Sequence, residues 1–201
     1  MRCKYVLFIF LVVSITTQSV QAVTVIDTGE GGTGYAATGL GGIPNQSTAA
    51  EFTLDMAYII TDIEGWMRTF TGNQATIVIY SDAGEIPGIE IYSGTFDAYQ
   101  TNYSWQGAHN LDWLLAAGTY WVSFEVREFD NLFAGLPVGI GGNGPPNPLG
   151  NEAYYTPSNG RWVELDNLDF AVRIQGIPVP EPMALTLMVI GLASLGFCRK
   201  G

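Results

Sequence analysis

The segment Thr119-Tyr-Trp-Val-Ser-Phe-Glu-Val-Arg127 alternates between apolar and polar side chains, a pattern that predicts a β-strand. Successive side chains of a strand point to opposite faces, so one apolar set should face a hydrophobic core. That set comprises Tyr120, Val122, Phe124 and Val126. Trp121 is out of phase with it and is therefore expected on the opposite face, either under a loop or exposed.

A second segment with the same period is Leu168-Asp-Phe-Ala-Val-Arg-Ile174. Further runs rich in β-branched and aromatic residues also have the length of strands. They are Val23–Asp27, Glu51–Leu54, Tyr58–Ile63, Ala75–Tyr80, Glu90–Phe96 and Arg161–Leu165. Turn residues separate these runs, and helical periodicity is nearly absent between the termini. The pattern predicts an all-β fold, an antiparallel β-sandwich of jelly-roll type.

Two glycine-rich segments, Gly29–Gly42 and Gly135–Asn151, interrupt the strand pattern. Glycine permits positive φ and proline cannot donate to a sheet ladder, so both segments are expected to lack regular structure. A glycine-rich loop binds phosphate where it opens a helix, and no helical pattern follows Gly42. Phosphate binding is therefore not expected.

The 201 residues suffice for one domain, expected over residues 23–177 between two terminal segments. Four arginines, no lysine and eighteen of the 19 acidic residues lie in that range, which gives it a formal charge of −14. Such a surface repels phosphate backbones, so nucleic acid is not an expected partner. Both cysteines, Cys3 and Cys198, lie in the terminal segments, which excludes disulfides from the domain.

Residues 1–22 have the layout of a secretory signal peptide. Arg2 and Lys4 precede an apolar run over Tyr5–Ile15, and Ala22 supplies a small residue before a cleavage site. The apolar run is shorter than the roughly 20 residues that a membrane span needs. We therefore expect a signal helix that directs export and is removed after Ala22.

Residues 178–201 combine three features in a fixed order. Val179-Pro-Glu-Pro182 comes first, the apolar stretch Met183–Phe197 follows, and two basic residues stand near the end. The prolines separate the apolar stretch from the domain, so it should begin a new helix. Its length of about 22 Å makes it a marginal single transmembrane helix, and the basic residues should stay cytoplasmic.

This ordered triplet resembles the PEP-CTERM sorting signal of Gram-negative bacteria. In that family the signal is handled by an exosortase, an integral-membrane cysteine peptidase. The resemblance implies a sorting motif of Val179, Pro180, Glu181 and Pro182 and a stop-transfer signal of Arg199 and Lys200. It also implies export through a secretion translocon, a membrane tether, and then a place at the cell surface or outside the cell.

One turn inside the domain resembles the same group of proteins. Ile77-Val-Ile-Tyr-Ser-Asp-Ala-Gly-Glu-Ile-Pro-Gly88 is similar to a strand, turn and strand unit in the β-sandwich domains of exported PEP-CTERM proteins. Its aspartate and glycine favour a tight reversal. Asp82 and Glu85 could instead bind calcium, as could Asp166 and Asp169, because hard cations prefer carboxylate oxygens. No other cofactor is expected.

The residues needed for catalysis are sparse. His109 is the only histidine, and neither a Gly-x-Ser-x-Gly elbow nor a His-Glu-x-x-His pair occurs. We expect His109 in a loop or at a strand edge and predict no catalytic residue. Two carboxylates about 5–10 Å apart could still serve a glycosidase, so a polysaccharide-acting enzyme is the third hypothesis.

Five tryptophans and ten tyrosines offer flat apolar surfaces that stack on sugar rings where they are exposed. Trp121 and Trp105 are the candidates for glycan contact. The residues and the resemblance together predict an exported structural or adhesive protein of the cell envelope or extracellular matrix, associated with exopolysaccharide or biofilm. A carbohydrate- or calcium-dependent binding module is the alternative.

Overall fold

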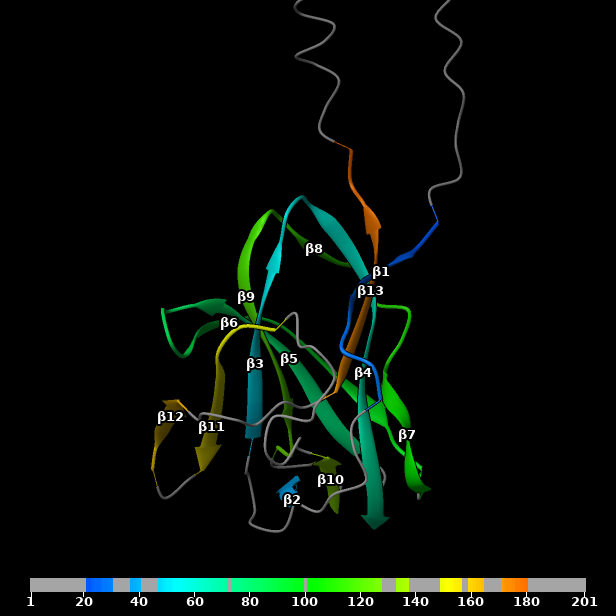
Figure 1. Ribbon diagram of the computed structural model, residues 1–201, viewed down its shortest axis with the longest axis vertical. Coiled ribbons are helices and arrows are strands. Elements are labelled where there is room, and N and C mark those ends of the chain that lie inside the picture. Colours follow the sequence, from blue (N-terminus) through cyan, green and yellow to red (C-terminus); the bar gives the residue numbers. More distant parts are fainter. Residues whose placement is uncertain are drawn as a thin grey trace, which may run out of the picture.

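The computed structural model describes nine stretches of the chain, and every regular element within them is a β-strand. These stretches are 21–30, 37–40, 47–71, 74–99, 101–127, 133–137, 149–156, 159–164 and 171–180. Their thirteen strands form two antiparallel sheets (Figure 1). The prediction of an all-β, antiparallel fold is confirmed for this part of the chain.

The larger sheet has seven strands. They are β1 (Val23–Asp27), β2 (Ala37–Leu40), β4 (Tyr58–Thr71), β7 (Thr101–Ala108), β8 (Trp113–Leu115), β10 (Phe133–Pro137) and β13 (Val172–Pro178). The 14-residue strand β4 is the centre: β13 and β10 pair with one of its edges, and β8 and β7 pair with the other. β1 continues the sheet beyond β13, and β2 continues it beyond β10.

The smaller sheet has six strands in the order β12-β11-β3-β9-β5-β6. They are β3 (Ser47–Leu54), β5 (Gln74–Asp82), β6 (Pro87–Asp97), β9 (Gly118–Glu125), β11 (Glu152–Thr156) and β12 (Arg161–Glu164). The segment that opened the sequence analysis is β9, and it lies in the middle of this sheet, between β3 and β5. Val122, Phe124 and Val126 of its predicted apolar set are buried, and Tyr120 is partly buried.

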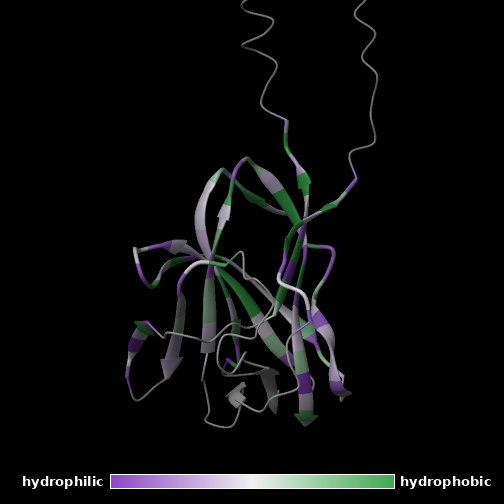
Figure 2. Ribbon diagram, in the orientation of Figure 1, coloured by the Kyte–Doolittle hydropathy of each residue, from purple (hydrophilic) through white to green (hydrophobic). Residues whose placement is uncertain are grey.

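The two sheets share one hydrophobic core. Val122 and Phe124 of β9 are fully buried in it together with Ile63 and Met67 of β4, as the period-2 alternation predicts. Hydrophobic and polar residues alternate along the strands that contribute to the core (Figure 2). Phe96 of β6 meets the Phe124 ring edge to face, with centroids 6.4 Å apart. The core therefore joins the two sheets in a sandwich-like arrangement.

The expectation that both glycine-rich segments lack regular structure is wrong in part. β2 lies inside the first segment, and β10 overlaps the start of the second. The two strands pair antiparallel, with Gly135 opposite Gly39 and Pro137 opposite Ala37. A ladder needs only backbone groups, and Pro137 stands at the end of its strand, where a missing N–H is tolerated. Glycine content alone therefore did not exclude strands here.

The first and last of the described strands lie side by side. β1 pairs antiparallel with β13, and Val23 is opposite Gly176. Thr28 extends the contact, because its N–H donates to the Val172 carbonyl over 3.1 Å and its hydroxyl accepts from the Val172 N–H over 2.8 Å. The start of β1 and the end of β13 thus lie at one end of the molecule (Figure 1).

Candidate functional site

Trp121 is fully buried although its side chain points away from the main core. It belongs to a second, smaller hydrophobic cluster on the outer face of the six-stranded sheet. We call this the Trp121 cluster, made of Ala49, Tyr80, Trp121, Ala153 and Trp162. A ring without exposed surface offers no face to a sugar, so the structure does not support Trp121 as a glycan contact.

Asp82 supports the buried indole of Trp121 from the turn between β5 and β6. The Trp121 Nε1–H and the Gly84 backbone N–H each donate to Oδ1 of Asp82 over 3.0 Å. Gly84 has a φ of +96°, in the left-handed region that favours glycine. The aspartate and the glycine therefore close a tight reversal, as the sequence predicts.

Calcium was the alternative role for this turn. Among the residues that the structure describes, no three His, Cys, Asp or Glu side chains group closely enough to hold a metal ion. Oδ1 of Asp82 is already an acceptor for two N–H groups, and Glu85 is exposed. Asp166 and Asp169 lie outside the described residues. Calcium binding stays a prediction.

Replacing Asp82 by alanine is expected to lower the free energy of unfolding by about 1–3 kcal/mol, because the buried Trp121 N–H loses its acceptor. Urea denaturation followed by tryptophan fluorescence measures the loss. Asp82→Asn is the matched control, since its amide oxygen keeps an acceptor at the same place. An equal loss in both variants would show that the charge of Asp82 matters, and not its hydrogen bond to Trp121.

A polar network continues from the Trp121 cluster along the outer face of the six-stranded sheet. The Tyr80 hydroxyl donates to Oε1 of Glu125 over 2.6 Å, and Arg127 Nε donates to Oε2 over 2.9 Å. Arg127 Nη2 also lies 2.7 Å from Oε2 of Glu90. Glu125 is 6% exposed and has both oxygens partnered, which is the condition for burying a carboxylate.

Within this network the pKa values of Tyr80 and Arg127 are raised and that of Glu90 is lowered. Burial, followed by the charge of Glu125 and the hydrogen bond to it, raises the pKa of Tyr80 well above its ordinary value of 10.0. The hydrogen bond from Arg127 lowers the pKa of Glu90. The folded chain therefore holds Tyr80 as a neutral donor and Glu90 as a carboxylate.

Tyr80→Phe is expected to reduce the loss of stability at alkaline pH. Above pH 10 the unfolded chain releases the phenol proton while the folded chain keeps it. The stabilisation is therefore complete below that pH and falls as the pH rises, by at most about 1.4 kcal/mol per pH unit and by less at this partly exposed ring. Urea denaturation at about pH 9 and about pH 11 compares the two proteins across this window. Identical losses in both would contradict the prediction.

Trp105, the other predicted glycan contact, lies on the outer face of the seven-stranded sheet. It is half-buried on β7 and pairs in the ladder with Trp66 of β4, which is also half-buried. The two ring centroids are 5.5 Å apart with an interplanar angle of 63°. The guanidinium of Arg173, on β13, lies over the Trp105 ring at 4.2 Å from its centroid. Three adjacent strands thus bring two partly exposed indoles and one cation together.

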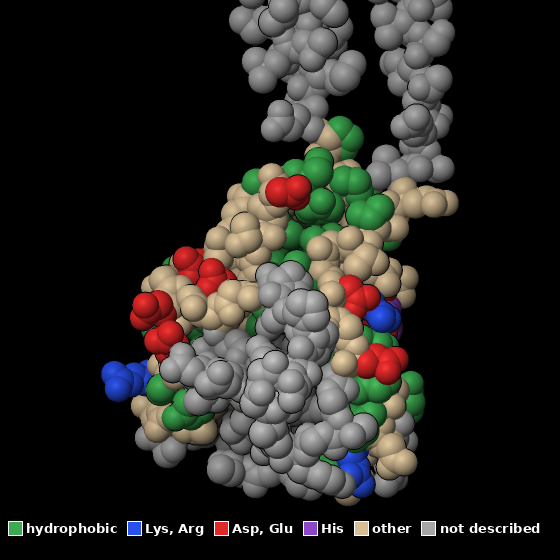
Figure 3. All heavy atoms as spheres, in the orientation of Figure 1, with side chains coloured by type: hydrophobic (Ala, Val, Ile, Leu, Met, Phe, Trp, Pro, Cys, Tyr) green, Lys and Arg blue, Asp and Glu red, His purple; other side chains and the backbone are tan. Residues whose placement is uncertain are grey.

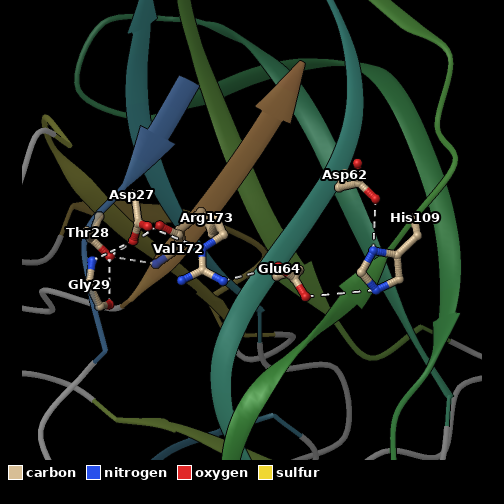
Figure 4. Close-up of polar contacts among 8 residues, drawn as sticks. All are labelled: Asp27, Thr28, Gly29, Asp62, Glu64, His109, Val172 and Arg173. Atoms are coloured by element: carbon tan, nitrogen blue, oxygen red, sulfur yellow. Dashed lines mark hydrogen bonds and ion pairs between the residues drawn. The ribbon is translucent and has the colours of Figure 1, made fainter. Parts of the chain in front are cut away.

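On the same face, acidic side chains flank Arg173 and His109 (Figure 4). Arg173 lies between Asp27 and Glu64, with Nε 3.2 Å from Oδ2 of Asp27 and Nη1 3.8 Å from Oε2 of Glu64. His109 lies between Asp62 and Glu64, with Nδ1 2.9 Å from Oδ1 of Asp62 and Nε2 3.9 Å from Oε1 of Glu64. We call the whole set the Trp105 face: Asp27, Asp62, Glu64, Trp66, Trp105, His109 and Arg173.

The prediction that His109 lies in a loop or at a strand edge is confirmed. It directly follows β7, its side chain is 51% exposed, and the next residue, Asn110, turns the chain with a φ of 56°. On the Trp105 face, carboxylates accept hydrogen bonds, Arg173 donates them, and the imidazole can do either. These groups beside partly exposed indoles are what a sugar requires: polar partners for its hydroxyls and a flat apolar surface for its C–H groups.

Comparisons with protein-family models, curated proteins and solved structures found no match. Among the described residues, no helix has both the length and the apolar character needed to cross a membrane. The apolar runs Tyr5–Ile15 and Met183–Phe197 lie outside those residues.

Proposed function

We propose that this chain is an exported structural or adhesive protein of a Gram-negative cell envelope or extracellular matrix, sorted by an exosortase and in contact with polysaccharide. The observation that carries the proposal is that the described strands begin just after the predicted signal peptide and end just before the predicted sorting motif. β1 begins at Val23, one residue after the predicted cleavage site, and β13 ends at Pro178, just before the sorting motif. Removal of both segments would leave the sheets intact.

The sorting motif begins where the sheet ends. The Val179 N–H donates to the Ala57 carbonyl over 2.9 Å, and the next residue, Pro180, is exposed. A membrane peptidase must bind its recognition segment in an accessible form, and an exposed proline without an N–H to donate suits that need. Glu181 and Pro182 lie outside the described residues, as do Arg199 and Lys200, so their roles rest on the sequence.

The finer architecture belongs to the same proposal. It comprises a jelly-roll type of sandwich, a signal helix over residues 1–22 and a single transmembrane helix within residues 178–201. Support for the jelly-roll type comes from the connections, because most consecutive strands lie in different sheets. Support for the two helices comes from the apolar runs in the sequence.

Glu181→Ala is expected to leave the C-terminal segment uncut when the chain is expressed in a bacterium that has an exosortase. The reason is that the variant removes the only charge of the Pro-Glu-Pro element. Mass spectrometry of the mature protein distinguishes the cut chain from the uncut one. Glu164→Ala, at an exposed position on β12, is the control and should be processed normally. Normal cleavage of Glu181→Ala would mean that Glu181 is not part of the recognition element, whereas a wild-type chain that stays uncut would mean that the tail is a plain anchor.

Within this proposal the Trp105 face is the contact for a neutral polysaccharide. Three carboxylates against one guanidinium leave the face with a negative charge when His109 is neutral. A negative face repels acidic sugars, whereas neutral sugar hydroxyls can donate to its carboxylates. The C–H groups of a sugar ring can cover the exposed parts of Trp66 and Trp105.

Trp105→Ala is expected to weaken binding to a neutral polysaccharide about tenfold, the change that corresponds to losing one aromatic contact of about 1.4 kcal/mol. Affinity electrophoresis through gels that contain neutral polysaccharides measures retardation of the folded protein. Trp162→Ala is the matched control, since Trp162 is also half-buried but lies on the other sheet. Equal retardation of the wild type and Trp105→Ala would remove this face from the proposal.

A further inference from the structure

We propose that the end of the domain where β1 begins and β13 ends rests on the bilayer, through an apolar patch of the seven-stranded sheet. This inference rests on the proposed function, because it takes Met183–Phe197 to be the membrane-embedded stretch. It adds a lipid contact made by the folded domain itself. It also sets the orientation in which the domain stands on the membrane.

Three strands contribute one row of apolar side chains at this end. Ile59 of β4 pairs with Leu114 of β8 on one side and with Ile177 of β13 on the other. Cross-strand partners project to the same face, and the neighbouring Ile60 is buried in the core, so this row lies on the outer face. Leu114 is 55% exposed, and the other two are partly exposed.

One further residue enlarges the row at the extreme end of the sheet. Val179, two residues after Ile177, is partly exposed. We call Ile59, Leu114, Ile177 and Val179 the end patch. Hydrophobic side chains gather at this end of the space-filling view (Figure 3). Contiguous exposed apolar surface of this kind marks a contact with a protein or a membrane.

The short distance along the chain between β13 and Met183 favours a membrane over a protein as the partner of the end patch. Only four residues separate Pro178, the last residue of β13, from Met183. Five Cα–Cα steps of at most about 3.6 Å span about 18 Å when the chain is fully extended. The headgroup layer on each side of a bilayer core is itself about 5–8 Å thick. The end patch therefore cannot stand far above the headgroups, and a slight tilt brings it into them.

The charges near the end patch select the kind of lipid. Asp55 precedes β4 and Asp112 precedes β8, both are exposed, and the patch itself carries no charged side chain. Acidic neighbours disfavour an anionic leaflet. A zwitterionic surface such as phosphatidylethanolamine is free of that repulsion, and contact with it grows with the apolar area buried.

A depth measurement on the full chain tests the contact. Cys3→Ser and Cys198→Ser remove the native thiols, after which a fluorophore is attached at Leu114→Cys or, as the matched control, at Thr71→Cys. Thr71 is exposed and ends β4, whereas the end patch lies at the start of that strand. Each labelled chain is reconstituted in phosphatidylethanolamine and phosphatidylcholine vesicles whose acyl chains carry a nitroxide. We expect at least twofold quenching at position 114 and none at position 71.

Three other results would overturn the inference, and they are distinguishable. Retention of the chain after an alkaline wash, with no quenching at position 114, would leave the tether and remove the lipid contact. Protection of position 114 from iodide in water without nitroxide quenching would assign the patch to a second copy of the chain. Release of the whole chain by the alkaline wash would remove the membrane tether, and with it both the contact and this part of the proposed function.

Discussion

Trp121→Ala is expected to lower the free energy of unfolding by about 3–5 kcal/mol, the range for deleting a large aromatic side chain from a packed interior. The indole is fully buried, and its neighbours Ala49 and Ala153 are too small to fill the space it would leave. The variant also removes the donor to Asp82. Urea denaturation followed by circular dichroism measures the loss without relying on tryptophan emission.

Two variants separate the contributions of Trp121. Trp121→Phe keeps most of the apolar volume but loses the Nε1–H, so its loss should lie between those of the wild type and Trp121→Ala. Trp162→Ala removes a half-buried indole from the same cluster and should cost less, because less apolar surface leaves the interior. If Trp121→Ala lowers the free energy of unfolding no more than Trp162→Ala does, then Trp121 is not buried in solution.

Gly107→Ala is expected to destabilise the domain by about 3 kcal/mol, at the upper end of the usual cost of overpacking. A Cβ at this position of β7 would overlap the Ile63 carbonyl oxygen and lie 2.7 Å from Cα of Glu64. Both are backbone atoms of β4, which cannot rotate aside as a side chain can. β7 would have to move away from β4 and carry Trp105 and His109 with it.

The test of Gly107→Ala therefore has two measurements. Urea denaturation gives the stability, and retardation by neutral polysaccharide reports whether the Trp105 face keeps its arrangement. Gly84→Ala is the control: its Cβ meets nothing within 4 Å, but its φ of +96° should cost about 1–2 kcal/mol. A loss for Gly107→Ala no greater than that for Gly84→Ala would contradict the close approach of the two strands.

The strands that alternate cleanly could be predicted from the sequence, and the reason is physical. β1 occupies the predicted range Val23–Asp27, and β9 buries Val122 and Phe124 as its period requires. The alternation of apolar and polar residues along a strand predicts the face of the sheet on which a side chain lies. It does not predict which other residues cover that face. Trp121 was therefore assigned to the correct side, while its complete burial depended on residues of β3, β5, β11 and β12 that lie far away in the sequence.

Strands with small or mixed residues could not be predicted in this way. The segment Thr101–Ala108 contains polar and aromatic residues without a clear period, yet it forms β7 against the long edge of β4. Glycine and proline likewise prevented the prediction of β2 and β10, which pair with each other through backbone hydrogen bonds. In such segments the tertiary partner decides the structure, and local propensity does not.

One residue of the candidate site could be predicted from its type. The way in which the other residues come together around it could not. Trp105 stood out as a tryptophan, but Arg173 and Glu64 come from strands that only the register places together. The predicted strand Tyr58–Ile63 was too short, because β4 continues through Gly65 to Thr71. That continuation places Glu64 and Trp66 on the same face as Trp105.

The pairing of β1 with β13 also affects when the domain can fold during synthesis and export. Thr28 and Val172, which are joined by hydrogen bonds, are 144 positions apart, so the first of the described strands cannot complete its pairing until the last one has been synthesised. Contacts of such long range close slowly, and the domain cannot complete this sheet while its final strand is still inside a ribosome or a translocation channel. If the chain is exported, its topology delays folding until passage is nearly complete.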